Sequence, residues 1–474
     1  MTPSPGWVTD ETQALLVDLY ELTMAQAYVA EGITGRAVFS LYFRTMPAER
    51  NYVLACGLDD VLRFLETLRF GTTALEGVRA LGGFTDDFLH WLGRLRFSGD
   101  VFAVPEGTPL FPGEPILEVA APIAEAQLLE TMVMNQIHVQ SVLGSKAARL
   151  VTAAAGREVV DFGLRRMHGA DAGIKGARAF HIAGLAGTSN VLAGTLYGIP
   201  VRGTMAHSYV QAHATELDAF RSFVRHWPEA ALLVDTYDTL QGVEHVIALA
   251  RELGDDFRVR AIRIDSGDLE ALAVAARERL DAAGLERMRI VVSGGLDERQ
   301  IAGLVARGVP ADGFGVGSEL AVARDAPVLD LVYKLVEYAG SGRLKTSPGK
   351  ATLPGRKQVF RRYAGGEAVG DVIARADEEA AGQPLLRRVM RAGARTDAGC
   401  ESLEAARARA AEEIAALPAR VRSLDPARPP YPVSVSAALR REAERLAALA
   451  AAPQPQPGIR RDSPAPAPRK PGHS

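Results

Sequence analysis

Short apolar runs alternate with helical segments through the middle of the chain. Each run ends in polar or glycine residues, and six can be recognised: Glu158–Phe162, Pro200–Gly203, Ala231–Asp235, Arg260–Ile264, Arg289–Val292 and Phe314–Val316. Successive apolar positions favour buried parallel strands, because only a sheet covered on both faces buries the side chains of both its sides. In a βα barrel the carboxyl ends of such strands open onto one face, where active sites lie. The pattern predicts an α/β fold with a TIM-like barrel and a site at these strand ends.

The chain before these strands predicts a mixed α/β unit. Apolar residues recur at near-helical spacing within Thr12–Ala30, and Val38–Phe43 alternates as a strand does. From Asp100 to Glu125, short β-branched runs alternate with Pro-Gly turns, which favours a small antiparallel unit. We expect a long helix from about Ala126 to Ala154.

After Gly366 the composition changes toward Ala, Arg and Glu, and the sequence favours helices over Ser402–Leu417 and Ser436–Ala451. The tail is rich in Pro, Gln, Arg and Ser and has no periodicity, which is typical of disorder. We therefore expect an N-terminal α/β domain over residues 1–140, the barrel over 141–345, a C-terminal helical extension packed on the N-terminal domain over 346–452, and a disordered tail over 453–474.

The composition excludes several classes of protein. Of 474 residues, 47% are hydrophobic and 23% are charged, and 54 basic against 57 acidic residues give a formal net charge of −3. We therefore expect no nucleic-acid or membrane partner. Met1–Glu11 lacks a signal-peptide pattern, and no run approaches the roughly 18 apolar residues of a membrane span. Cys56 and Cys400 are too few for a disulfide framework or a thiolate metal site, which fits a reducing cytoplasm.

The first candidate site group follows the first buried strand. The segment DFGLRR places Phe162 beside Arg165 and Arg166. An aromatic face can hold a flat heterocycle, and a guanidinium group binds carboxylate or phosphate with two parallel hydrogen bonds. The alternative is a core phenylalanine followed by two surface arginines.

The second group follows later strands. His207 lies just beyond an apolar run, where a structural histidine is the alternative to a catalytic one. Arg263 lies inside an apolar strand, so it needs a partner, and Asp265 and Asp268 offer acceptors for hydroxyls or a metal-bound phosphate. A structural salt bridge is the competing explanation. We interpret Asp235 and Asp238 as further carboxylates at the barrel mouth.

Two glycine-rich turns follow successive strands and predict a phosphate cradle. Free backbone N–H groups next to a helix N-terminus form an anion site. The residues concerned are Ser293, Gly294, Gly295, Gly315, Gly317 and Ser318. Schiff-base chemistry is disfavoured, because Lys175 and Lys334 do not fall at a strand end. We predict no site in which side chains alone would hold a metal.

Eight segments between about Leu15 and Arg362 share their wording and order with one enzyme family. They are LYELTMAQAY (Leu19–Tyr28), NYVLACGLDDVL (Asn51–Leu62), DFGLRR (Asp161–Arg166), GTSNVLAGTLYGIPVRGTMAHSYV (Gly187–Val210), LLVDTYDT, IRIDSGD, FGVGSEL and PGRKQVFR (Pro354–Arg361). On these segments the chain resembles the nicotinate phosphoribosyltransferases. The resemblance implies an irregular α/β barrel with an N-terminal α/β domain.

The resemblance also implies a reaction and its participants. Nicotinate and 5-phosphoribosyl 1-diphosphate would give nicotinate mononucleotide and diphosphate, in NAD salvage, with ATP as co-substrate, Mg²⁺ as cofactor and a cytoplasmic homodimer as the enzyme. Displacement of diphosphate builds positive charge on the sugar and negative charge on the leaving group, which calls for carboxylates near the one and cations near the other.

The resemblance assigns roles to individual residues. Phe162 would stack on the pyridine ring, and Tyr20 of the neighbouring subunit would close the other face. Arg165 and Arg263 would contact nicotinate and the sugar phosphate, while Asp265 would hold ribose hydroxyls. His207 would be phosphorylated by ATP, with Asp235 orienting its ring. The carboxylate end would be lined by Thr188, Ser189 and Asn190, and Gly295 and Gly317 would receive the 5-phosphate.

Three alternatives remain open on the sequence. A nicotinamide enzyme of this class would place an aspartate near the Gly-Thr-Ser-Asn segment, where Thr188 and Ser189 stand instead. A quinolinate enzyme would need more basic groups for its second carboxylate, and that family lacks the His207 segment. An inactive nucleotide-binding homologue would be expected to have lost His207, Arg263 or Asp265, and all three are present.

Overall fold

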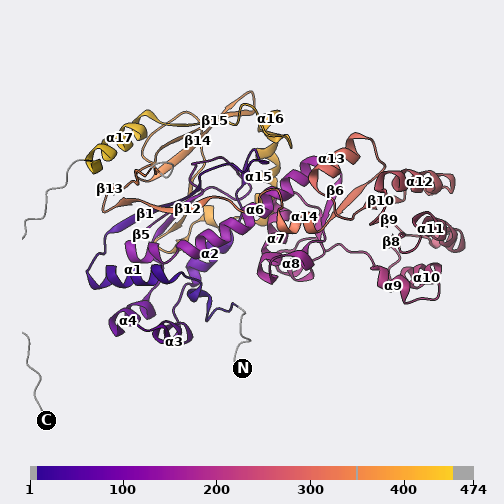
Figure 1. The fold of residues 1–474 in the computed structure, drawn as a ribbon, viewed down its shortest axis with the longest axis horizontal. Helices are drawn as coiled ribbons and strands as arrows, with labels where there is room; N and C mark the ends of the chain where they lie inside the picture. The colour runs from indigo at the N-terminus through magenta and orange to yellow at the C-terminus, as the bar shows by residue number, and fades with distance from the viewer. Residues whose placement is uncertain (1–7, 348–350, 452–474) are drawn as a thin grey trace, which may run out of the picture.

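The computed structural model describes residues 8–347 and 351–451, which form an α/β molecule with sheets at both ends (Figure 1). One end holds an antiparallel sheet and a smaller sheet beside it. The other end holds a parallel sheet with helices α9 to α13 around it, and the long helix α6 lies between the two ends. The predicted tail over residues 453–474 lies outside the described residues.

The antiparallel sheet has seven strands in the order β13-β12-β1-β5-β3-β17-β18. Its strands are β1 (Arg36–Phe43), β3 (Asp100–Ala103), β5 (Leu117–Pro122), β12 (Leu331–Tyr338), β13 (Ser341–Gly342), β17 (Arg387–Arg391) and β18 (Ala394–Arg395). β1 is buried along its length except at Arg36, because seven of its eight residues face packed neighbours. The predicted strand at Val38–Phe43 and the predicted antiparallel unit, in which β3 pairs with β5, are confirmed.

The parallel sheet has six strands in the order β7-β6-β11-β10-β9-β8. They are β6 (Glu158–Asp161), β7 (Gly187–Thr188), β8 (Ala231–Leu233), β9 (Ala261–Ile264), β10 (Arg289–Val292) and β11 (Gly313–Val316). Five of the six predicted runs are confirmed as strands. The strand predicted at Pro200–Gly203 is wrong, because this segment contributes only a single bridge, from Val201 to Thr188.

The closed barrel expected from the sequence is not seen in the described residues. β7 and β8 are both edges of the parallel sheet, and no strand pairing joins them within residues 8–347 and 351–451. The physical reason is the lost sixth strand, because Val201 pairs with Thr188 and leaves β8 without a neighbour on its outer side. The carboxyl ends of β6, β8, β9, β10 and β11 nevertheless open to one side, because these strands run parallel.

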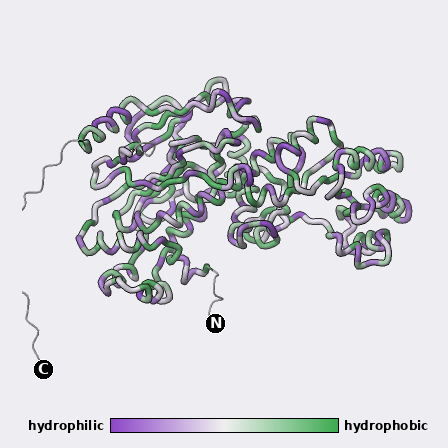
Figure 2. Tube along the Cα trace, in the orientation of Figure 1, coloured by the Kyte–Doolittle hydropathy of each residue, from purple (hydrophilic) through white to green (hydrophobic). Residues whose placement is uncertain are grey.

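The helices confirm most of the periodic patterns. In chain order they are α1 (Leu19–Ala30), α2 (Leu58–Thr67), α3 (Thr72–Leu81), α4 (Asp86–Arg94), α5 (Ile123–Gln127), α6 (Glu130–Ala154), α7 (Ala170–Ile182), α8 (Val191–Tyr197), α9 (His207–Gln211), α10 (Glu216–His226), α11 (Thr239–Leu253), α12 (Leu269–Ala282), α13 (Glu298–Ala306), α14 (Ser318–Val322), α15 (Leu403–Ala415), α16 (Ala419–Arg422) and α17 (Ala437–Ala451). The expected first helix begins only at Leu19. Outer helices show both purple and green along their length, as amphipathic helices do (Figure 2).

The C-terminal segment is not the helical extension that the sequence predicted. Helices α15 and α17 are present, but a four-stranded sheet in the order β16-β14-β15-β19 precedes and joins them. Its strands are β14 (Lys357–Ala364), β15 (Glu367–Arg375), β16 (Gln383–Pro384) and β19 (Val433–Val435), and β2 (Val53–Leu54) pairs separately with β4 (Pro109–Leu110). β17, β18 and β12 complete the N-terminal antiparallel sheet, so that sheet draws strands from three of the expected domains. The domain boundaries themselves stay a prediction.

Candidate active site

A cavity of about 420 Å³ lies at the carboxyl ends of the parallel strands, within the size range of small-molecule sites. It is lined by the segment after β6, the turn after β7, the segment that leads into α9, the end of β8, and β9 with the residue after it. The sequence-predicted residues that it brings together are Phe162, Arg165, Ser189, His207, Arg263 and Asp265. Residues far apart in the chain therefore converge on one hollow, as parallel strands require.

Arg263 is held by three hydrogen bonds at the centre of this site. Its Nε donates to Oγ of Ser293 at 2.8 Å, and its Nη1 donates to Oγ1 of Thr204 at 3.0 Å. Its Nη2 donates to Oδ1 of Asp265 at 2.6 Å, and the guanidinium carbon lies 5.3 Å from the ring centroid of Phe162. The predicted salt bridge and the predicted site position are therefore both present. The fixed cation beside an aromatic face suits an anionic flat ligand.

Asp265 carries a negative charge beside His207. Burial raises the pKa of Asp265, but the hydrogen bond from Ser293 at 2.5 Å and the charge of Arg263 outweigh burial and lower the pKa overall. Its free oxygen Oδ2 lies 4.0 Å from Nε2 of His207. The ionised carboxylate thus faces the histidine and the open cavity.

His207 is the first residue of α9, and its side chain is 41% exposed. Its Nδ1 lies 3.1 Å from Oγ1 of Thr236, within hydrogen-bond distance. The role of Asp235 in orienting this ring stays a prediction; in this structure its Oδ2 accepts hydrogen bonds from the backbone N of Asp265 at 3.0 Å and from Oγ of Ser266 at 2.6 Å. Asp235 holds the β9 turn, and Thr236 holds the imidazole.

Thr236 and Thr204 contact site residues although the sequence did not predict them. They lie in the segments LLVDTYDT and GTMAHS, whose predicted site residues are Asp235, Asp238 and His207. Thr236 follows Asp235 just beyond β8, a position that could have identified it, whereas Thr204 lies in the loop before α9 and has no such signal. A hydroxyl can hydrogen-bond to an imidazole and can accept from a guanidinium group.

The turn after β7 serves mainly to hold β6 in place. Oγ1 of Thr188 donates to the buried carboxylate of Asp161 at 2.6 Å, and Oδ1 of Asn190 caps α8 by accepting from Ala193 N. Burial raises the pKa of Asp161, although hydrogen bonds from Thr188 and Gly163 oppose it. Of the three predicted residues only Ser189 lines the cavity; the side chains of Thr188 and Asn190 are buried in internal hydrogen bonds.

The glycine-rich turns lie side by side, because β10 and β11 are neighbours in the sheet. A Cβ on Gly294 would come within 1.9 Å of the carbonyl oxygen of Asp265, and one on Gly315 would come within 2.4 Å of the Phe162 ring. Those two glycines are explained by packing. Gly295 has open space around the Cβ position, and the nearest atom to that of Gly317 is 3.5 Å away, so both leave room for a ligand. Neither turn is among the cavity's lining residues.

Several other predicted residues have structural roles or lie elsewhere. Asp238 and Asp268 cap α11 and α12 by accepting from backbone N–H groups, as N-cap residues do. Arg166 is exposed next to the cavity but does not line it. Lys175 pairs with Asp171, and Lys334 belongs to the antiparallel sheet, so neither amine lines the cavity.

Tyr20 is outside the cavity of its own chain. It lies on α1 with 44% of its surface exposed, and burial together with the charge of Glu130 raises its pKa. Leu16, Leu19 and Met24 are exposed beside it, which makes this part of the chain an apolar surface. A role for Tyr20 at the site requires a second chain.

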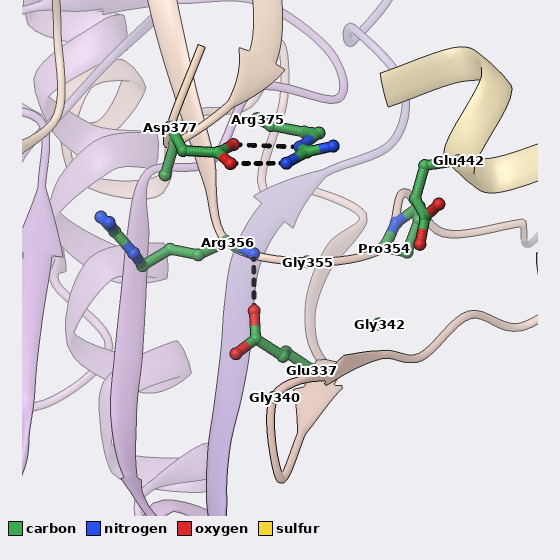
Figure 3. A pocket seen from close by; sticks show the side chains of 10 residues that line it. Glu337, Gly340, Gly342, Pro354, Gly355, Arg356, Arg375, Asp377 and Glu442 are labelled. Atoms are coloured by element: carbon green, nitrogen blue, oxygen red, sulfur yellow. Dashed lines mark hydrogen bonds and ion pairs between the residues drawn. The ribbon is translucent and has the colours of Figure 1, made fainter. Parts of the chain in front are cut away.

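A second cavity of about 320 Å³ lies between the β12–β13 hairpin, β15 and α17 (Figure 3), at the end of the molecule opposite the parallel sheet. Among its lining residues Arg375 forms an ion pair with Asp377, and the backbone N of Arg356 donates to Glu337 at 3.4 Å. No sequence-predicted site residue lines it in the described part of the chain. The cavity at the strand ends is therefore the candidate active site.

The fold and this cavity define an α/β protein that can hold a flat anionic ring at the carboxyl ends of a parallel sheet. Comparisons with known proteins identify the family. Residues 15–138 match the nicotinate phosphoribosyltransferase N-terminal domain, and residues 157–347 match the nicotinate phosphoribosyltransferase family. The chain belongs to the nicotinate phosphoribosyltransferase family.

Individual relatives agree with this assignment over most of the chain. The chain is 56% identical over 433 residues to nicotinate phosphoribosyltransferase pncB2 of Mycobacterium tuberculosis, covering 91% of this chain and 94% of that protein. It is 39% identical to nicotinate phosphoribosyltransferase of Bacillus subtilis, covering 80% and 79%. The crystal structure of human nicotinic acid phosphoribosyltransferase superposes with a TM-score of 0.81 at 29% identity, covering 90% of this chain and 99% of that one. No helix in residues 8–347 or 351–451 is long and apolar enough to cross a bilayer.

Proposed function

We propose that this chain joins nicotinate to 5-phosphoribosyl 1-diphosphate, giving nicotinate mononucleotide and diphosphate in NAD salvage. The observation that carries the proposal is the convergence of Phe162, Arg263 and Asp265 in one cavity: a ring platform, a fixed cation and an ionised carboxylate. Family membership supports the same reaction.

The site residues suit the charges of this displacement. The bond from the sugar C1 to diphosphate breaks as the bond from the pyridine nitrogen to C1 forms, so C1 becomes positive and diphosphate leaves with the electron pair. Asp265 stabilises the developing positive charge and accepts from ribose hydroxyls, and Gly295 and Gly317 give backbone room for the 5-phosphate. Arg263, fixed by Ser293 and Thr204, contributes without reorganisation during the reaction.

Selectivity for nicotinate follows from charge. Nicotinate and nicotinamide have nearly the same shape, and Arg165 and Ser189 line the cavity on the Phe162 side. A guanidinium group and a hydroxyl donor favour a carboxylate over an amide by about 1.5–3 kcal/mol, the range of a charge-assisted hydrogen bond.

We propose that ATP phosphorylates His207. Its Nδ1 is engaged by Thr236, which leaves Nε2 as the nucleophile. The N–P bond at Nε2 forms as the bond from the γ-phosphorus to ADP breaks. The added negative charge would organise the diphosphate and its counter-ion.

Mg²⁺ is the counter-ion proposed for the diphosphate. No cluster of three or more His, Cys, Asp or Glu side chains able to hold a metal occurs in the described residues, so the chain supplies only part of a coordination shell. This fits Mg²⁺, which binds through one or two carboxylates plus substrate phosphates and water. The ionised Asp265 would hold it, and the ion would neutralise charge on the leaving group.

The active enzyme is proposed to be a homodimer in the cytoplasm. The exposed apolar surface around Tyr20 on α1 suits an interface with a second chain, which would bring the Tyr20 ring to the partner's cavity. A reducing compartment suits the two unpaired thiols, Cys56 and Cys400.

A product assay tests the proposal. The enzyme is incubated with 5-phosphoribosyl 1-diphosphate, Mg²⁺ and one of nicotinate, nicotinamide or quinolinate, with and without ATP, and the mononucleotides are separated and quantified. We expect nicotinate mononucleotide to dominate and ATP to raise its yield. Equal turnover of nicotinate and nicotinamide, or preference for quinolinate, would show that the assigned substrate is wrong.

A further inference from the structure

Five charged side chains form a buried ion cluster behind the two glycine-rich turns. Lys146 and Arg149 come from α6, Glu298 from α13, and Arg50 and Asp325 from loops. All five side chains are at most 8% exposed. The catalytic chemistry proposed above uses none of them.

Lys146 makes the shorter contacts to the two carboxylates together, and Arg149 also pairs with both, its Nε lying 3.9 Å from Asp325. The Nζ of Lys146 forms ion pairs with Glu298 and, at 3.2 Å, with Asp325. Arg149 Nε adds an ion pair to Glu298 at 2.9 Å, and Arg50 Nε adds one to Asp325 at 2.8 Å. Opposing charges thus compensate the burial of both carboxylates, whose pKa values fall despite burial because these cations surround them.

The two carboxylates belong to the segments that follow the two turns. Glu298 is the first residue of α13, and Leu296 and the N-cap residue Asp297 separate it from the Ser293–Gly295 turn. Asp325 follows α14, the short helix that begins after Gly317. α6 packs against both α13 and α14 and leads into β6, whose end carries Phe162. Helix α6 therefore links the two turns to one support, with Lys146 making the closest contacts to both carboxylates.

We propose that Lys146 is a positioning residue that sets the spacing of the two glycine-rich turns and so the affinity for the 5-phosphate of the sugar substrate. The inference rests on the proposed function, because it takes the turns as the phosphate cradle. Without Lys146, Arg149 and Arg50 still balance the charge of the two carboxylates, but the ammonium that contacts both at short range is gone, so the spacing of α13 and α14 is no longer fixed. The turns, which are the N-terminal ends of these segments, move with them.

The test compares Lys146→Met with a matched control, Lys357→Met. Lys357 is another buried lysine, 3% exposed and 3.0 Å from its partner Glu118, but it joins β14 to the antiparallel sheet at the far end of the molecule. Each substitution removes one buried lysine that forms at least one ion pair. Glu298→Gln, which keeps the side-chain shape, is a second variant that decides the matter if Lys146→Met does not fold.

Two measurements are made on each full-length variant. Steady-state kinetics gives KM for 5-phosphoribosyl 1-diphosphate and for nicotinate, and calorimetry gives the Kd of ribose 5-phosphate, which needs no turnover. For Lys146→Met we expect both the sugar-substrate KM and the ribose 5-phosphate Kd to rise at least about tenfold, since an ångström-scale displacement of a binding group can cost about 100-fold. KM for nicotinate should change less than about twofold, and Glu298→Gln should show a smaller rise of the same kind.

The outcomes separate the inference from the proposed function. Unchanged ribose 5-phosphate binding in Lys146→Met and Glu298→Gln overturns the inference, as does an equal weakening in Lys357→Met, which would show a general loss of stability. Absence of ribose 5-phosphate binding to the unaltered enzyme also overturns it. If the unaltered enzyme makes no nicotinate mononucleotide but binds ribose 5-phosphate, and the Kd values of the variants rank as expected, the proposed function fails and the inference holds.

Discussion

Replacing Arg263 by Met removes the cation that joins Phe162, Ser293 and Asp265, and its effect can be estimated from the contacts. Removing one preorganised group that stabilises charge in an active site costs about 2.7–4 kcal/mol of transition-state stabilisation. The side chain of Asp265 is 29% exposed, so solvent screens part of the charge left behind, and we expect a loss of about 2–3 kcal/mol in transition-state stabilisation. At about 1.36 kcal/mol for each factor of ten, kcat/KM should fall roughly 30- to 150-fold.

The same substitution should change the dependence on pH. In the unaltered site Arg263 helps to keep the pKa of Asp265 below its ordinary value, so the carboxylate stays ionised as the pH falls. Without the arginine, burial raises the pKa of Asp265, and the acid limb of the profile of kcat/KM against pH should move to higher pH. The assay is the initial rate of nicotinate mononucleotide formation at subsaturating substrate across the acid range.

Arg289→Met is the matched control. Arg289 lies at the other end of the neighbouring strand β10, in an exposed ion pair with Glu158 at 2.7 Å, and its loss should leave kcat/KM and the pH profile unchanged. Retention of kcat/KM within about threefold in Arg263→Met, or an acid limb that does not move, would refute the reasoning about this site.

Three further outcomes are expected. His207→Ala should abolish incorporation of labelled γ-phosphate while ATP-independent synthesis persists, whereas Thr236→Val should slow incorporation only about fivefold, the worth of one neutral hydrogen bond; label in His207→Ala would place the phosphate elsewhere. Mixing Tyr20→Ala with His207→Ala chains should restore ATP-stimulated synthesis in mixed dimers, and no recovery of the ATP stimulation over a range of mixing ratios would argue against sharing. Burial raises the pKa of Glu21 to about 7, so folding holds a proton there that the unfolded chain releases near pH 4.5, and the free energy of unfolding should decrease as pH rises through that interval by about 2–3 kcal/mol. Glu21→Gln should flatten this slope in urea denaturation series, and an unchanged slope would assign it to other groups.

The parallel strands could be predicted because their apolar runs are continuous and buried on both faces. The C-terminal sheet could not, because β14 and β15 carry charges that are buried in pairs. Arg361 and Asp371 are both fully buried and hydrogen-bonded at 2.7 Å, yet in the sequence they interrupt the apolar pattern of two adjoining strands. Pairing across strands is what permits their burial, and pairing is not visible along a single strand.

The members of the site were easier to predict than their contacts. Position at a strand end identified Phe162, Arg263 and Asp265, whose side chains do converge. It did not distinguish Asp235 from Thr236, because neighbouring residues at the end of a strand point in different directions. Which of the two residues contacts His207 depends on how the turn after β8 packs against the turn after β9 and against α9. These contacts join segments that are distant in the sequence.

The pairing of β1 with β12 has a consequence for the making of the protein. On a ribosome, β1 finds β5 soon after both have emerged, but its other long edge waits for a partner about 300 residues further along. At about 5–20 residues per second, that apolar strand has one open edge for roughly 15–60 s. Throughout this interval the nascent chain displays a template for pairing with other chains. During the biosynthesis of this enzyme, one edge of β1 therefore stays open to incorrect pairing until β12 has been made.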